Sequence, residues 1–484
     1  MFIVVAIIAA LGMQISAKDT YLKLLNCVAL GLLIVSGGWT VRQTLTQGSY
    51  TYGSGLLYWD ALSALLLSVI VIIAVYVIIF SFGYMEAEIR EKRFPQARLK
   101  WYYFWIWIFM ATMLLVVSTP NLGIIWVGIE ATTLATTLLV GFYRNKQAVE
   151  AAWKYVILCT VGISFALLGT MLLFAAASPL LGQSLSALDW RMLPTVAGQL
   201  DPTLFRLGAL FAVVGYGAKV GFAPMHAWLP DAHSQAPSPV SALLSAVLLN
   251  CALYAILRWY SLARLTTLGA DFVGTILMCL GFLSLALMAG FILMQKDIKR
   301  LLAYSSVEHM GILALGFGLG TRETVWGASL HLLLHGLTKA NLFVIIGNLV
   351  QKTGTRHMSR IHGVFKLWPY TGLIMVLGLL SITGTPPFGT FRSELSILSG
   401  LYKTGHPIMG FLTILFLTVI FAGFLYHFLQ MLYGEPRESQ QPGESASTLI
   451  LAIPLLVVLF LGLFIPQSLN QTLNQVVQVI LGGV

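Results

Sequence analysis

Long apolar stretches recur along the whole chain and constrain the fold more than any other feature of the sequence. One helix needs about 20 mostly apolar residues to cross the hydrocarbon core of a bilayer. Fourteen such stretches can be marked, at residues 2–17, 23–41, 58–82, 101–119, 122–142, 151–177, 205–228, 239–260, 272–294, 300–320, 325–350, 370–400, 408–433 and 447–466. The sequence therefore predicts an all-α polytopic membrane protein with about 14 transmembrane helices.

Composition supports this class and excludes several others. Of the 484 residues, 58% are hydrophobic and only 10% are charged, which excludes a secreted domain, a disulfide scaffold and a nucleic-acid-binding protein. In a polytopic membrane protein, the distribution of the basic residues behind the net charge of +10 indicates which loops face the cytoplasm. The loops after odd-numbered spans carry 17 Lys and Arg residues and the other loops carry seven. The positive-inside rule then predicts cytoplasmic odd loops and both termini on the outer side.

Several ionisable residues fall inside the predicted spans, where a charge costs about 2.5–3.5 kcal/mol on insertion scales. The residues are Glu130 in the fifth span, Lys154 near the start of the sixth, Lys219 in the seventh, His331, His335 and Lys339 in the eleventh, and Glu394 in the twelfth. The three in the eleventh span are spaced four residues apart, which places them on one helix face. Ion pairs that only hold helices together would not need both acidic and basic groups in several successive spans. We therefore expect these residues to transfer protons.

Metal binding is the other reading of the His331 and His335 pair. No acidic or thiol ligand accompanies the two histidines in their span, so a hydrogen-bonding or proton-transfer role is favoured over zinc. The four cysteines, Cys27, Cys159, Cys251 and Cys279, are far apart and match no iron–sulfur, haem or zinc spacing. We therefore expect no metal and no cofactor in this chain.

Prolines interrupt two spans beside ionisable residues. Pro224 and Pro230 follow Lys219 in the seventh span, and residues 385–389 (Thr-Pro-Pro-Phe-Gly) precede Glu394 in the twelfth. Paired breaks at corresponding positions indicate a transport site between repeats. The pattern predicts two inverted five-helix repeats with broken helices 7 and 12. The expected organisation is a three-helix segment at 1–100, repeats at 101–262 and 263–433, and a C-terminal helix and tail at 434–484.

Two motifs resemble those of a known family. Residues 219–244, which begin KVGFAPMHAWLPDAH, and residues 297–311, DIKRLLAYSSVEHMG, are similar to signatures of the antiporter-like, proton-pumping subunits of respiratory complex I and its relatives. Within that family, residues 129–134 and 150–155 most resemble component F of hydrogenase-4-type complexes, a relative of the M-type subunit. The resemblance covers nearly the whole chain.

The resemblance implies roles for individual residues. Glu130 and Lys219 match a pair thought to gate proton uptake, Lys154 matches a sixth-helix lysine, and Glu394 falls at the exit side. His331, His335 and Lys339 match the central polar axis. Asn250 departs from the M-type pattern, which has a lysine in the eighth helix. His226, His233, Glu308 and His309 stay open between proton entry or exit and simple hydrogen bonding, and Arg392 has no assigned role.

The mechanism that we expect is a switched proton carrier. A carboxylate of Glu130 about 4 Å from Lys219 would stabilise the ammonium by about 4 kcal/mol at an effective dielectric constant near 20. When Glu130 is drawn away, burial would favour release of the proton toward the eleventh-span residues and Glu394.

The expected function is a proton-translocating membrane subunit of a multi-subunit redox-driven complex, similar to a membrane-bound hydrogenase or an NADH-quinone oxidoreductase. Iron–sulfur clusters, and a nickel–iron centre or flavin, would lie on partner subunits. The partners would be other antiporter-like subunits, a peripheral redox arm and the lipid bilayer of a bacterial or archaeal cytoplasmic (inner) membrane. Two alternatives are a cation/proton antiporter subunit of a non-redox exchanger and a structural membrane anchor.

Overall fold

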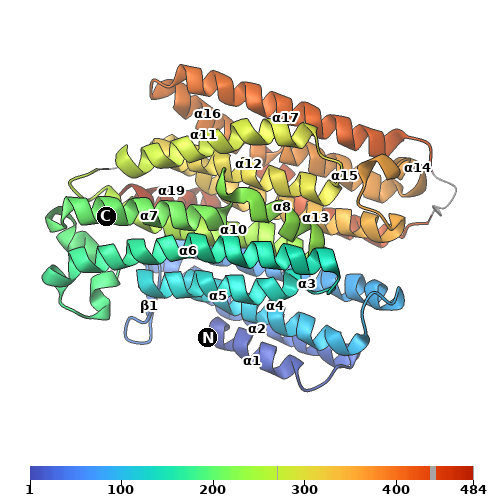
Figure 1. The fold of residues 1–484 in the computed structure, drawn as a ribbon, viewed down its shortest axis with the longest axis horizontal. Coiled ribbons are helices and arrows are strands. Elements are labelled where there is room, and N and C mark those ends of the chain that lie inside the picture. Colours follow the sequence, from blue (N-terminus) through green and yellow to red (C-terminus); the bar gives the residue numbers. More distant parts are fainter. Residues whose placement is uncertain (270, 437–442, 483–484) are drawn as a thin grey trace.

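The fold is an elongated bundle of helices, most of which run along its long axis (Figure 1). The computed structural model describes residues 1–269, 271–436 and 443–482. The helices of the first half are α1 (Phe2–Met13), α2 (Asp19–Gln47), α3 (Ala61–Arg90), α4 (Leu99–Val116), α5 (Leu122–Val140), α6 (Lys146–Leu181), α7 (Pro202–Val220), α8 (Trp228–Gln235), α9 (Ser238–Leu243) and α10 (Leu249–Ala263). Those of the second half are α11 (Asp271–Leu293), α12 (Ile298–Leu319), α13 (Arg322–Thr353), α14 (Val364–Leu367), α15 (Pro369–Ile382), α16 (Gly389–Lys403), α17 (Pro407–Tyr433), α18 (Ile453–Leu463) and α19 (Gln467–Leu481).

Helical structure lies at every one of the fourteen predicted spans. Ten helices among the described residues are long and apolar enough to cross a membrane, or eleven if α18 and α19, which meet at 81°, form one bent span. The polytopic all-α fold is thus confirmed, whereas the number of fourteen crossings stays a prediction. The hairpin of β1 (Tyr50–Tyr52) and β2 (Leu57–Trp59) is antiparallel.

Helix α19 replaces the C-terminal tail that we expected after residue 466. Its apolar side chains recur at helical spacing, and Leu473, Val476, Val477 and Ile480 are buried. Glutamines and asparagines occupy much of the rest of the helix. Such a segment has too many polar residues to register as an apolar span, yet it forms an amphipathic helix once a partner surface is available.

Both expected helix breaks are found beside ionisable residues. Helix α7 ends at Val220, one residue after Lys219, and Gly221 adopts a left-handed conformation with φ of +84°. Pro224 lies in this break, but Pro230 does not, because it sits in the first turn of α8, where the missing N–H of proline is tolerated. The second break separates α15 from α16 at residues 383–388. A π-helical turn at Leu244–Leu248 was not expected.

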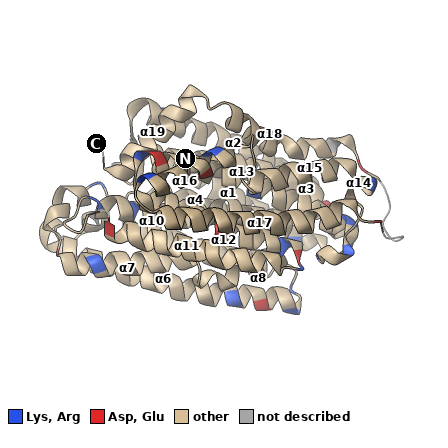
Figure 2. Ribbon diagram, turned by 90° about the horizontal axis from the view of Figure 1, so that it is seen from above, with Lys and Arg blue, Asp and Glu red and all other residues tan. Residues whose placement is uncertain are grey.

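One of the most enclosed helices, α13, carries three of the ionisable residues predicted to lie inside the membrane. The most apolar stretch of Ser238–Ala263 is entirely buried and that of α13 is 89% buried, against 28% for α17. Helix α13 contains His331, His335 and Lys339, and each of these side chains is at most 1% exposed. Charged residues otherwise gather toward the ends of the bundle (Figure 2). The interior charges are therefore surrounded by protein and shielded from the hydrocarbon.

Glycines allow two helix pairs to pack at backbone contact. A Cβ built on Gly169 of α6 would lie 2.5 Å from the carbonyl oxygen of Gly208 in α7. In the second half, a Cβ on Gly281 of α11 would lie 2.6 Å from the carbonyl oxygen of Gly311 in α12. Small residues at such contacts are the usual basis of close helix packing in membranes.

A buried ion pair fixes α3 against α10. The Arg258 guanidinium donates to both carboxylate oxygens of Asp60 at 2.6 and 2.7 Å, and it lies 3.9 Å from the ring centroid of Trp190. Asp60 is also the N-cap of α3, because it accepts from the Ser63 amide. The side chains of both charged partners are at most 7% exposed, so neither can be solvated if the other is lost.

We expect Arg258→Ala to destabilise the protein by about 3–5 kcal/mol, because it leaves the Asp60 carboxylate buried without its partner. Lys403→Ala is the control, since it breaks an ion pair with Glu323 in which both side chains are well exposed, and exposed pairs contribute about 0–1 kcal/mol. Thermal unfolding in one detergent measures both. Equal losses of stability in the two variants would contradict this account.

Gly281→Ala should also lower thermal stability, by roughly 1–3 kcal/mol, because the added methyl group forces α11 away from α12. Gly290 lies on the same helix with nothing within 4 Å of a built Cβ. Gly290→Ala should therefore be neutral or slightly stabilising. The same melting assay compares them, and a stable Gly281→Ala variant would show that backbone contact does not set this packing.

Candidate functional site

The first buried polar group is centred on Lys219. Its side chain is fully buried, and its ammonium donates to the Thr133 hydroxyl at 2.9 Å and to the Tyr155 hydroxyl at 2.6 Å. The ammonium also lies 4.6 Å from the Tyr155 ring centroid, a distance at which the ring face attracts a cation. Lys219 stands in the last turn of α7, where the helix dipole favours positive charge.

Glu130 belongs to the same group. We expected its carboxylate to pair directly with Lys219, but a hydroxyl lies between them. The Thr133 hydroxyl, which accepts from Lys219, lies 3.3 Å from one carboxylate oxygen of Glu130. The Thr160 hydroxyl donates to the other oxygen at 2.9 Å. Thr133 follows Glu130 by three residues on α5, so its hydroxyl occupies the space between the carboxylate and the ammonium. No direct ion pair joins the two charges in the described structure.

Lys154 lies apart from this group. It is 49% exposed near the start of α6 and pairs with Glu150 at 2.7 Å and with Asp231 at 3.3 Å. Asp231 also pairs with Arg300 at 3.0 Å. The structure therefore places Lys154 in an ion-pair network with α8 and α12 and does not bring it to Lys219.

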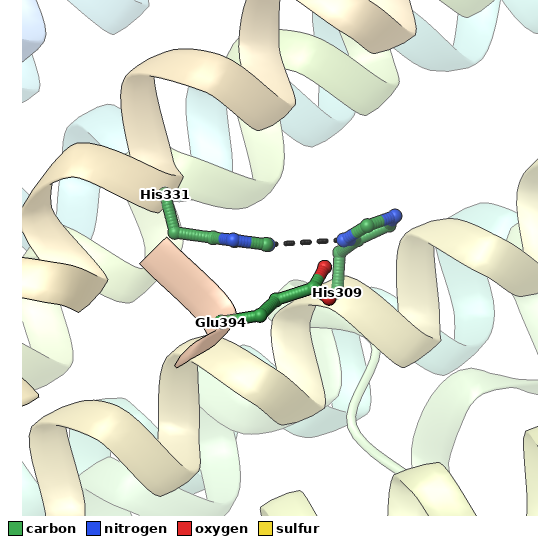
Figure 3. Close-up of side chains that lie close together, drawn as sticks. All are labelled: His309, His331 and Glu394. Carbon is green, nitrogen blue, oxygen red and sulfur yellow. Dashed lines mark hydrogen bonds between the residues drawn. The ribbon is translucent and has the colours of Figure 1, made fainter. Parts of the chain in front are cut away.

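The second buried group joins three helices. His309 of α12 and His331 of α13 share a hydrogen bond of 2.9 Å between Nδ1 and Nε2, and the other nitrogen of His331 lies 2.8 Å from the Ser393 hydroxyl. Glu394 of α16 approaches the same two rings, so that one ligand-type atom from each residue lies within 4.8 Å of the others. Figure 3 shows the three side chains converging from separate helices.

Lys339 extends this group along α13. Its ammonium donates to the Leu302 carbonyl at 2.9 Å and to the Ser305 hydroxyl. Among the described residues, no carboxylate is within ion-pair distance of Lys339. The His335 ring is tilted against that of His309, with ring centroids 5.3 Å apart. Both ring nitrogens of His335, like Glu308 Oε2, are buried without a protein partner.

The contact between His309 and His331 also decides what the cluster with Glu394 can do. Two nitrogens bound to one tetrahedral zinc ion lie about 3.3 Å apart, given Zn–N bonds of about 2.0–2.1 Å. The observed 2.9 Å is that of a hydrogen bond, which requires a proton on one of these nitrogens. In this arrangement the two rings are hydrogen-bonded to each other, and the same two nitrogens could bind one zinc ion only if they separated by about 0.4 Å.

The remaining candidates lie outside both groups. His226 is near Phe291 and Tyr304, and His233 stacks on Phe343 with ring centroids 5.2 Å apart. Both ring nitrogens of His233 and Nδ1 of His226 are buried without a protein partner. Asn250 donates to the Ala246 carbonyl at 2.8 Å. Arg392 is exposed and lies 5.7 Å from the Trp326 ring centroid.

Sequence reasoning missed the neutral hydroxyls that hold the charges. Thr133 and Tyr155 contact Lys219, Ser305 contacts Lys339, and Ser393 contacts His331. Thr133 could have been found from its spacing of three residues after Glu130 on one helix. The other three contacts join residues on different helices, so no local sequence pattern predicts them.

Comparison with known proteins places this arrangement in a family. The family model described as NADH:quinone oxidoreductase/Mrp antiporter, TM, matches residues 119–421. That of the N-terminus of NADH-ubiquinone oxidoreductase (complex I) chain 5 matches residues 54–95. A hydrogenase-4 component F homolog from Methylacidiphilum infernorum (isolate V4) is 38% identical over 364 residues, which are 75% of this chain and 76% of that protein.

Solved structures show the same fold. A chain of the membrane-bound sulfane sulfur reductase, an archaeal respiratory membrane complex, superposes with a TM-score of 0.87 at 22% identity, over 99% of this chain and 97% of that chain. A chain of the Mrp complex from Dietzia sp. DQ12-45-1b gives a TM-score of 0.85 at 18% identity, over 99% and 96% of the two chains. The protein is therefore a member of the NADH:quinone oxidoreductase/Mrp antiporter family of polytopic membrane subunits.

Proposed function

We propose that this chain is a proton-translocating membrane subunit of a redox-driven, complex I-like assembly, most similar to the hydrogenase type. The observation that carries the proposal is a fully buried lysine held by two neutral hydroxyls, with a carboxylate one hydroxyl away. A lysine without a direct counter-ion in a dry interior binds its proton only weakly. A small movement of the nearby carboxylate then changes whether the proton is held or released.

The proposed path runs from the Lys219 group to the second group. Glu130 acts on Lys219 through Thr133, and the proton leaves toward Lys339, the histidines and Glu394. No hydrogen bond between described side chains joins the two groups, so the transfer between them needs water. The unpartnered nitrogens of His233 and His335 and the Asn250 side-chain oxygen are groups of the kind that bind internal water. Lys154 takes no part in this path.

Two matching helix starts support the proposed inverted repeats. Asn121 caps α5 by accepting from the amides of Gly123 and Ile124, and it forms an isolated antiparallel bridge with Asp189. Asp297 caps α12, the helix of the span five positions later, in the same way, and it bridges His357. These equivalent caps and bridges are what two copies of one repeat would retain. The repeats would cover residues 101–262 and 263–433.

The energy for pumping would come from partner subunits. Moving one charge across a membrane potential of 100 mV costs about 2.3 kcal/mol. We propose that iron–sulfur clusters and a nickel–iron centre or flavin lie in a peripheral arm, and that other antiporter-like subunits adjoin this chain. The chain would reside in a bacterial or archaeal cytoplasmic membrane, with both termini outside. The name of the hydrogenase-4 component F homolog is the reason for preferring the hydrogenase type.

A cation/proton exchanger is the second candidate, because the fold is shared with a chain of an Mrp complex. Sodium prefers hard oxygen ligands. The interior groups contain two lysines and three histidines, whose nitrogens are poor ligands for sodium, and their acidic members are Glu130 in the first group and Glu308 and Glu394 in the second. This donor set favours protons over sodium as the ion that moves.

Lys219→Ala tests the function directly. Loss of the buried ammonium should lower proton pumping about tenfold or more, while electron transfer by the redox partners continues. Proton uptake into vesicles that contain the intact complex measures the effect, with Arg392→Ala as a control outside both buried groups. Undiminished pumping by Lys219→Ala would refute the proposed carrier, and pumping that requires sodium would favour the exchanger.

Thr133→Val tests the link between Glu130 and Lys219. The change keeps the side-chain shape but removes the hydroxyl, and a hydrogen bond to a charged group is worth about 1.5–3 kcal/mol. We therefore expect pumping to slow by roughly tenfold. Thr137→Val is the matched control one turn along α5, because the Thr137 hydroxyl donates only to the Thr133 backbone carbonyl. Equal pumping rates in the two variants would show that Thr133 does not transmit the charge of Glu130.

A further inference from the structure

A groove on the outside of the bundle lies between α4, α5 and α6. Its volume is about 630 Å³, which is within the range of small-molecule sites. The walls are mostly apolar and aromatic, and two arginines stand among the lining residues. These residues are Arg98, Trp101, Trp105, Thr137, Leu138, Gly141, Phe142, Arg144, Val149, Ala152, Trp153 and Val156. The groove takes no part in either buried polar group.

The two arginines bring positive charge that the protein does not neutralise. Arg98 donates to the Phe142 carbonyl at 3.4 Å, a long and neutral contact. Neither Arg98 nor Arg144 has a carboxylate within ion-pair distance in the described part of the chain. Other basic residues at the same end of the bundle do form ion pairs, such as Arg93 with Glu88 and Glu91. A ligand with negative charge would therefore complement this groove.

The rest of the groove is suited to hydrocarbon. Trp101, Leu138 and Trp153 are 46%, 49% and 63% exposed on helices that cross the membrane. Tryptophans are favoured at the level of lipid headgroups, where one part of the ring is apolar and the N–H remains wet. Arg98 precedes α4 and Arg144 follows α5, in two loops that the charge distribution assigns to the cytoplasmic side. Cationic pockets between helices at that surface attract anionic lipid headgroups.

We propose that this groove binds an anionic phospholipid, with its phosphate between Arg98 and Arg144 and an acyl chain along the tryptophans and Leu138. The phosphate supplies the negative charge that the two guanidinium groups lack, and Arg can bind it through two parallel hydrogen bonds. The acyl chain covers exposed apolar side chains without any unpaired polar group. An apolar helix of a neighbouring subunit would cover the tryptophans but would leave both arginines uncompensated.

Native mass spectrometry of the purified full chain tests the proposal, with phosphatidylglycerol as the anionic probe and phosphatidylcholine as the zwitterionic one. The unaltered protein should bind phosphatidylglycerol more tightly. Each arginine near a headgroup contributes about fivefold in affinity, so Arg98→Gln with Arg144→Gln should weaken phosphatidylglycerol binding by about thirtyfold. Phosphatidylcholine binding should change little. Arg90→Gln with Lys92→Gln is the charge-matched control, because both residues are exposed at the end of α3 or just after it and neither lines the groove.

Further experiments distinguish a bound phospholipid from free phosphate or a neighbouring protein in the groove. Leu138→Trp should fill the groove and weaken both lipids while the arginines stay in place. Inorganic phosphate should not displace phosphatidylglycerol, and a photo-crosslinker at residue 138 in the intact complex should label lipid. The proposal is overturned if the double arginine variant behaves like the charge-matched control, if free phosphate competes, or if the crosslinker captures a protein neighbour.

Discussion

Every charge inside a membrane protein must be satisfied by protein groups or by enclosed water, and this requirement organises the structure around α13. The helix is enclosed on nearly all sides, and it carries His331, His335 and Lys339 at 0–1% exposure. Among the described residues, no direct ion pair balances Lys219 or Lys339. Neutral oxygens from threonine, tyrosine, serine and a backbone carbonyl hold Lys219 and Lys339. Such partners hold the ammonium in place without fixing its proton as firmly as a carboxylate would.

The partners of these interior lysines differ from those of the Asp60–Arg258 ion pair. Asp60 and Arg258 form a bidentate ion pair that holds α3 against α10. Each charge is therefore neutralised by a direct partner. Glu130 instead lies one hydroxyl away from Lys219, in a position that is only half-buried. Its distance from Lys219 can therefore change at a lower cost than the breaking of a direct buried ion pair.

Helix α8 links the two halves of the bundle. Asp231 of α8 pairs with Lys154 of α6 and with Arg300 of α12, so one carboxylate joins helices from the two proposed repeats. The break between α7 and α8 lies directly after Lys219. A shift of α8 would thus move both this interface and the end of α7.

The sequence by itself determined the membrane-spanning class, the positions of the helical segments up to residue 466, the two breaks and the family, because hydropathy, proline and the two long motifs are local properties of the chain. It also identified Lys219, His331, His335, Lys339 and Glu394 as interior groups. Only the tertiary structure decided which of these residues meet. In the structure the Thr133 hydroxyl lies between Glu130 and Lys219, which were expected to pair directly. His309 is hydrogen-bonded to His331, and Lys154 lies outside both buried groups. Contacts between helices depend on helix rotation and packing, which the sequence of a single helix does not encode.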